Sequence, residues 1–75
     1  MKRELKYIRT ENGFIVFSEP LMHSEIIVPG KKISAGFCSI TEGSAKCWGE
    51  SVSLNLIAKD EDGELLTIQI NRMWR

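Results

Sequence analysis

Metal ligands and catalytic nucleophiles are scarce in this chain, which has one histidine and two cysteines among 75 residues. Cys38 and Cys47 form no CxxC motif, and no second cysteine pair is present to complete a zinc site. His23 is the sole histidine available to activate either thiol, and the sequence does not place it near them. We therefore expect a protein that is not an enzyme and that holds no metal or other cofactor.

The chain also lacks an excess of either charge and any long apolar run. Ten basic and ten acidic residues give a formal net charge of +0, which argues against a nucleic-acid-binding protein. The longest apolar runs, Phe14–Phe17 and Ile26–Val28, are far shorter than the roughly 20 residues that span a membrane. The basic N-terminus is not followed by the apolar segment of a signal peptide. These features predict a cytoplasmic protein without membrane contact, with its cysteines reduced.

The chain is short, and residues 1–75 are expected to form a single small domain. A domain of this size buries only about 60% of the surface that its unfolded chain exposes. Small domains commonly compensate by oligomerisation, and a neutral net charge does little to keep copies apart. We expect self-association, most simply as a two-fold homodimer.

The first hairpin is predicted around Asn12-Gly13, a pair typical of a two-residue turn between strands. The strands would run from about residue 4 to 10 and from 14 to 17, with Thr10 opposite Ile15 and Ile8 opposite Phe17. The second strand is apolar on both faces, so it is expected to be covered on each side. The following residues, 18–32, offer helix caps at Ser18 and Ser24, with Pro20 tolerated in a first helical turn, but Pro29-Gly30 stops any regular element. They predict a short helical turn or an irregular edge.

The central stretch, residues 33–57, predicts a second hairpin with Glu42-Gly43 as its loop, although Gly43-Ser44 would shift the pairing. A Glu42-Gly43 loop would place three pairs of residues opposite each other, namely Cys38 and Cys47, Phe37 and Trp48, and Gly36 and Gly49. The opposed thiols would be either free or joined in a strained disulfide. The paired glycines would leave a gap that a ligand or another backbone could enter. Beyond them, apolar and polar residues alternate through residues 51–56, as in a strand with one buried face.

The tail, residues 60–74, fits either a helix or a fifth strand. The helix is favoured by an acidic cluster at its start and arginines at its end, which complement the helix dipole. The resulting fold is α+β, an antiparallel sheet of two hairpins with a C-terminal helix. The alternative is an all-β fold.

Several segments, taken in order, resemble a group of short phage- and prophage-encoded proteins of unassigned function. The matching segments are Lys6–Gly13, Ile15–Phe17, His23-Ser24, Ile33–Phe37 and Gly49–Leu54. Members of this group have one helix after the His-Ser pair and a second after an acidic cluster. Pro29-Gly30 interrupts the first here, so the resemblance implies only the second. It also implies an accessory role in a mobile element, and supplies no catalytic residue.

These considerations predict a non-catalytic binding protein that blocks or sequesters a host component. The candidate ligand- or partner-binding residues are Trp48, Phe37, Glu50, His23, Lys31, Lys32 and Arg9. The two aromatic residues would grip a protein, and the carboxylate would accept hydrogen bonds or simply end a strand in solvent. The alternative is sequestration of a small phosphorylated nucleotide at a subunit interface, bound by the three basic residues. A structural role for the histidine and a solvated loop for the lysines are the simpler readings of those positions.

Overall fold

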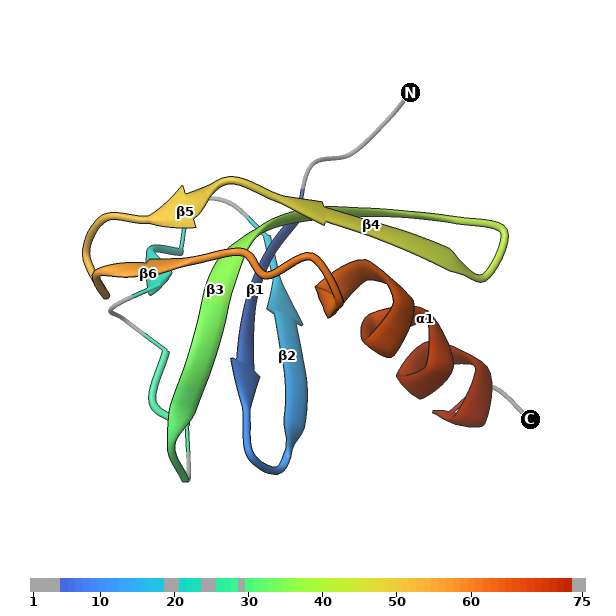
Figure 1. Ribbon diagram of the computed structural model, residues 1–75, viewed down its shortest axis with the longest axis horizontal. Coiled ribbons are helices and arrows are strands. Elements are labelled where there is room, and N and C mark those ends of the chain that lie inside the picture. Colours follow the sequence, from blue (N-terminus) through green and yellow to red (C-terminus); the bar gives the residue numbers. More distant parts are fainter. Residues whose placement is uncertain (1–4, 19–20, 24–25, 29, 74–75) are drawn as a thin grey trace.

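The computed structural model describes residues 5–18, 21–23, 26–28 and 30–73. A four-stranded antiparallel sheet has the order β2-β1-β3-β4, and a two-stranded sheet pairs β5 with β6 (Figure 1). The elements are β1 (Leu5–Thr10), β2 (Gly13–Phe17), β3 (Lys32–Thr41), β4 (Ser44–Trp48), β5 (Glu50–Ser51), β6 (Leu56–Ile57) and α1 (Asp62–Met73). The tail is a helix, so the α+β prediction is confirmed and the all-β alternative is wrong.

The first hairpin turns one residue earlier than predicted. Glu11 and Asn12 form the turn, and Thr10 pairs with Gly13. The Thr10 hydroxyl accepts a hydrogen bond from the Asn12 N–H (3.0 Å) and donates one to the Gly13 carbonyl (3.1 Å), which closes the earlier turn. Ile8 therefore lies opposite Ile15, not Phe17. The shift is two residues in register, so each side chain stays on its predicted face of the sheet.

The strand covered on both faces is β1, whereas the prediction assigned this position to β2. Tyr7 and Ile8 are adjacent, point to opposite faces, and are both fully buried. Strand β2 lies at the sheet edge, and all of its residues are only half-buried. An edge position leaves part of its apolar side chains in contact with solvent.

The second hairpin has the predicted register, with Phe37 opposite Trp48 and Cys38 opposite Cys47. Its loop is Glu42-Gly43, and both residues have positive φ, 51° and 78°. Positive φ at both central residues is the signature of the type I′ turn, whose twist matches that of the flanking strands.

The predicted long strand after Trp48 is interrupted, which corrects the expected alternation through residues 51–56. Gly49 has a φ of 81°, so the chain bends there before β5 begins. Asn55 is left-handed as well (φ 56°), and its N–H bonds to the Val52 carbonyl at 3.1 Å. The segment between β5 and β6 is therefore a turn, and the Val52 side chain is 82% exposed.

The connection from β2 to β3 is irregular where it is described, as predicted. Hydrogen bonds from the Leu21 N–H to the Ser18 carbonyl and from the Ile26 N–H to the His23 carbonyl close two local turns. The predicted cap at Ser24 and the positions of Pro20 and Pro29 lie outside the described residues.

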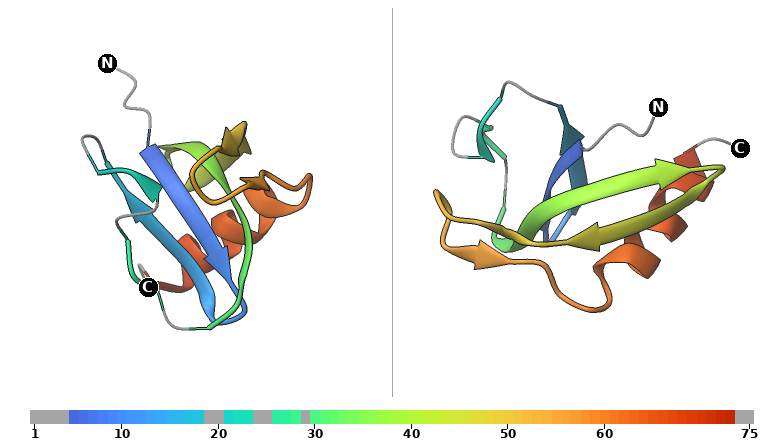
Figure 2. Two further views of the ribbon diagram at one scale, coloured as in Figure 1. Left: turned by 90° about the vertical axis from the view of Figure 1, so that its left-hand side faces the viewer. Right: turned by 90° about the horizontal axis from the view of Figure 1, so that it is seen from above.

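Helix α1 packs on one face of the sheet and bridges its two edge strands (Figure 2). Leu66 is buried against Tyr7, Cys38 and Ala45. Thr67 Oγ1 accepts a hydrogen bond from the Ala45 N–H on β4 at 2.8 Å. The Gln69 side-chain amide binds both backbone groups of Phe14 on β2, through the N–H at 2.8 Å and the carbonyl at 3.0 Å. The helix thus satisfies backbone groups that would otherwise be open on both edges of the sheet. Within the described residues, no helix has the length and apolarity required to cross a membrane.

Candidate functional site

A hollow of about 380 Å³ lies on the sheet face opposite α1, and we call it the Phe37 cup. Register places Lys6 and Phe37 side by side on β1 and β3, with their side chains pointing away from Tyr7 and the helix. The connection after β2 and the residues around β5 complete the wall. The cup is lined by Lys6, Met22, His23, Phe37, Glu50, Ser51, Val52 and Ser53.

His23 is part of the cup wall and is held by the chain itself. Its Nε2 lies 2.8 Å from the Gly36 carbonyl oxygen, and its residue is only 5% exposed. The imidazole packs edge-on against Phe17 and Phe37, with ring centroids 5.4 and 6.0 Å away. This arrangement gives the histidine a structural role, in which it fixes the Phe37 ring in place.

The gap expected between Gly36 and Gly49 is filled by the chain's own backbone. A Cβ at Gly36 would lie 2.5 Å from the Trp48 carbonyl oxygen, and a Cβ at Gly49 would lie 2.9 Å from the Phe37 ring. No ligand can enter here. The close approach instead lets the chain bend at Gly49, which brings Glu50 to the rim of the cup.

Glu50 and Trp48 stand on either side of that bend. Glu50 is exposed and makes no ion pair with another described residue. Trp48 is 40% exposed and lies opposite Phe37 on the neighbouring strand, so the two aromatic side chains share one face. The structure therefore brings together the predicted residues Phe37, Glu50 and His23, and places Trp48 beside them.

The three basic candidates lie elsewhere. Arg9 points to the other face, where its Nη1 contacts Glu61 at 3.2 Å and Asp62 at 3.0 Å. Lys31 and Lys32 are exposed near the end of β1, and the Lys31 carbonyl accepts a hydrogen bond from the Glu11 N–H at 3.0 Å. Within one copy they are not part of the hollow that Glu50 and His23 line.

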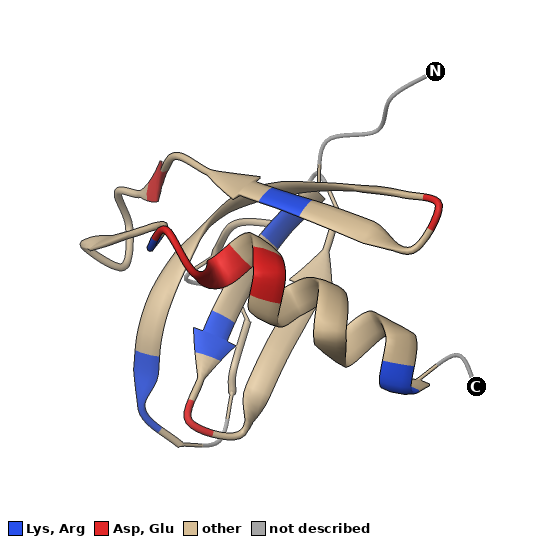
Figure 3. Cartoon of the chain, turned by 45° about the vertical axis from the view of Figure 1, so that its right-hand side comes forward, with Lys and Arg blue, Asp and Glu red and all other residues tan. Residues whose placement is uncertain are grey.

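A buried polar cluster under α1 was not predicted from the sequence. Asp62 is fully buried, and its carboxylate accepts hydrogen bonds from the Tyr7 hydroxyl (2.5 Å), Arg9 (3.0 Å) and the Lys59 N–H (2.9 Å). The Ser34 hydroxyl, also fully buried, faces the same carboxylate without meeting normal hydrogen-bond geometry. The start of α1, red in Figure 3, lies against β1, where Asp62 forms an ion pair with Arg9. The cluster anchors the helix to the sheet.

The cluster shifts the pKa of its members in opposite directions. Burial alone would raise the pKa of Asp62, but the hydrogen bonds from Tyr7, the Lys59 N–H and Arg9, with the Ser34 hydroxyl facing the carboxylate, together hold it below its ordinary value. Burial and the adjacent carboxylate raise the pKa of the Tyr7 hydroxyl well above its ordinary value. The folded state therefore favours an ionised Asp62 beside a neutral Tyr7.

Stability is expected to fall at both extremes of pH. The contribution of Asp62 is complete above its unfolded pKa of about 3.9, and is lost as the pH falls through the lower folded value. The contribution of Tyr7 is complete below its unfolded pKa of about 10, and is lost as the pH rises. Urea midpoints measured across the pH range test this, and Tyr7→Phe should remove the alkaline part. A wild-type midpoint that stays constant between about pH 5 and pH 3 would contradict it.

Both thiols are free, and both are poor nucleophiles at neutral pH. Burial raises the pKa of Cys38 to about 11. Burial, followed by the electrostatic effects of Cys38 and Asp62, raises the pKa of Cys47 to about 12. Neither thiol is poised for covalent catalysis. Within the described residues, no group of three or more histidine, cysteine or acidic side chains is arranged to hold a metal ion.

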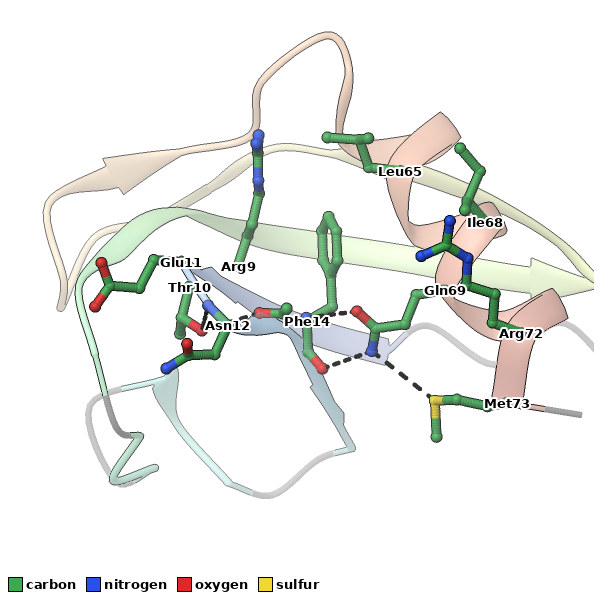
Figure 4. Close-up of a pocket in the computed structure, with 11 residues that line it drawn as sticks. Arg9, Thr10, Glu11, Asn12, Phe14, Leu65, Ile68, Gln69, Arg72 and Met73 are labelled. Carbon is green, nitrogen blue, oxygen red and sulfur yellow. Dashed lines mark hydrogen bonds between the residues drawn. The ribbon is translucent and has the colours of Figure 1, made fainter.

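A second hollow, of about 560 Å³, lies between the β1–β2 turn and α1 (Figure 4). Most of its polar groups serve the chain's own structure. Gln69 binds the backbone of Phe14, Arg9 is paired with acidic residues, and Glu11 accepts a hydrogen bond from the Lys31 N–H at 3.3 Å. This hollow is the junction between the helix and the hairpin, and we favour the Phe37 cup as the candidate site.

Comparison with protein-family models, with curated proteins and with solved structures finds no match to this chain.

Proposed function

We propose that this protein is a non-catalytic binding protein of the phage accessory type, and that it blocks or sequesters a host component through the Phe37 cup and Trp48. The observation that carries the proposal is the convergence of apolar and polar groups on one face. Phe37 forms the floor, Met22 (51% exposed) and Val52 (82% exposed) offer apolar surface, and Glu50 has no charged partner among the described residues. Exposed apolar groups with a polar rim mark interaction surfaces.

The phage assignment is supported by the resemblance of the sequence segments described above. The absence of catalysis is supported by the chemistry of the candidate groups. The single histidine is engaged with a backbone carbonyl, and the thiol pKa values lie far above neutrality. These groups suit a surface that binds without reacting.

The proposal is tested by recovering host components on immobilised protein and identifying them by mass spectrometry. Val52→Arg places a bulky charge on the rim of the cup and should abolish recovery of the specific component. Ile68→Arg is the matched control, since Ile68 is also an exposed apolar residue (43%) but lies on α1, on the other side of the sheet. Equal loss with both variants, or no component whose recovery depends on Val52, would refute the proposal.

Self-association is the second part of the proposal, and the apolar face around Trp48 is its natural location. Sedimentation equilibrium at micromolar concentration should give a mass above that of one chain, 8.5 kDa. Trp48→Ser should shift the equilibrium towards the monomer. A wild-type protein that sediments as a monomer throughout this range would remove this part of the proposal.

Sequestration of a phosphorylated nucleotide has less support. Arg9 is committed to Glu61 and Asp62, which leaves Lys31 and Lys32 as the basic groups for this function. The two exposed lysines are not among the residues that line the Phe37 cup, so they offer this function less support than the cup offers protein binding.

A further inference from the structure

The chemistry of the Phe37 cup indicates which kind of group it receives, an inference that rests on the proposed function. Among the described residues that line it, the carboxylate is that of Glu50, which forms no ion pair within the described part of the chain. Ser51 and Ser53 also line the cup; their hydroxyls lie 3.4 Å apart, Ser51 is buried, and Ser53 is exposed and offers an acceptor oxygen. A carboxylate with neighbouring acceptors is complementary to a cationic donor.

The cation among the described lining residues, Lys6, is already bound by the chain. Its Nζ donates a hydrogen bond to the Leu21 carbonyl at 2.9 Å, and it forms no ion pair with Glu50. Lys6 therefore leaves the negative charge of Glu50 open to an incoming group.

The walls of the cup suit the stem of a long side chain. Phe37 presents an aromatic ring that is held by His23, and Val52 and Met22 are exposed aliphatic groups. Lysine and arginine bury their methylene stems on such surfaces while the charged head remains at the rim, and a ring near the cation adds to the attraction. A hollow of about 380 Å³ with an exposed rim has room for one such side chain.

We propose that the Phe37 cup binds a lysine or arginine side chain of a partner protein, with the cationic head on Glu50 and the stem against Phe37, Val52 and Met22. The partner is therefore a protein with a basic, protruding side chain at its contact surface.

The test uses the full chain labelled with ¹⁵N and four small probes, the N-acetyl amides of arginine, lysine, norleucine and glutamate. The arginine or lysine probe should shift the amide signals of Phe37 and Glu50 in a saturable way. Glu50→Gln should weaken this binding about tenfold, as expected for the loss of a charge-assisted contact. Glu42→Gln, which changes an exposed carboxylate at the distant β3–β4 turn, should leave it unchanged.

Equal shifts with norleucine would show that the cup recognises only apolar groups, and would overturn the proposal. Shifts with glutamate alone would assign the site to anions through Lys6, and would overturn it as well. The absence of any shift would have the same consequence. The proposed function is judged separately, because recovery of a host component that depends on Val52 would uphold it even if every cationic probe failed.

Discussion

Replacement of Asp62 by alanine is expected to lower the free energy of unfolding by about 3–5 kcal/mol, a large part of the stability of a domain this small. Asp62 is fully buried and accepts hydrogen bonds from Tyr7, Arg9 and the Lys59 N–H. Its removal leaves the buried Tyr7 hydroxyl without an acceptor and detaches the start of α1 from β1. Urea unfolding followed by far-UV circular dichroism measures the loss.

Two further experiments separate the buried contacts from surface charge. Glu61→Gln removes the exposed partner of Arg9 and should have little effect, because exposed ion pairs contribute little. A double-mutant cycle of Tyr7→Phe with Asp62→Asn should give a coupling energy of about 1.5–3 kcal/mol, as for a hydrogen bond to a charged group. If Asp62→Ala were no more damaging than Glu61→Gln, the cluster would not be what anchors the helix.

Local turn chemistry explains why one hairpin was predicted correctly and the other was not. At Glu42-Gly43 the backbone adopts the positive φ values that a type I′ loop needs. At Asn12-Gly13 the same rule failed because the Thr10 hydroxyl bonds to both sides of an earlier turn. Such side-chain bonds to nearby backbone compete with the intrinsic preference of the Asn-Gly pair.

Long-range contacts could not be inferred from local patterns. The helix was predicted from charges placed at its ends, but Asp62 was read as one member of an acidic cluster. Its burial depends on Tyr7 and Arg9, which are more than fifty positions away along the chain. The use of Thr67 and Gln69 to satisfy the two sheet edges is equally invisible in the sequence, since both positions look like the exposed side of a helix.

The sequence predicted the relative positions of the candidate residues on the second hairpin, and did not predict those of the basic residues. Correct register placed Phe37 beside Trp48, and the bend at Gly49 brought Glu50 to them. The basic residues were grouped on charge alone. Alternation along β1 sends Arg9 to the face opposite Lys6, and there it finds acidic partners.

Replacement of Gly36 by alanine is expected to cost about 1–3 kcal/mol and to displace the bend that carries Glu50. The added Cβ would lie 2.5 Å from the Trp48 carbonyl oxygen, a backbone atom that cannot rotate away. The Gly36 carbonyl also accepts the contact from His23, so a shift of β3 would loosen the cup wall. Urea unfolding measures the stability, and Trp48 fluorescence in a Trp74→Phe background reports the displacement.

The side chain of Ala58, which also lies near Gly36, provides the control for this prediction. The same Cβ would lie 3.4 Å from Ala58 Cβ, an ordinary contact distance. If the clash with the backbone dominates, adding Ala58→Gly to Gly36→Ala should restore little of the lost stability. Full restoration would mean that a side chain at position 36 is excluded by Ala58 and not by the Trp48 carbonyl. Glu50 would then reach the rim without depending on the close approach of Trp48 to Gly36. Binding of the arginine probe to Gly36→Ala then distinguishes the two cases, because a displaced bend should weaken binding while Glu50 is still present in the chain.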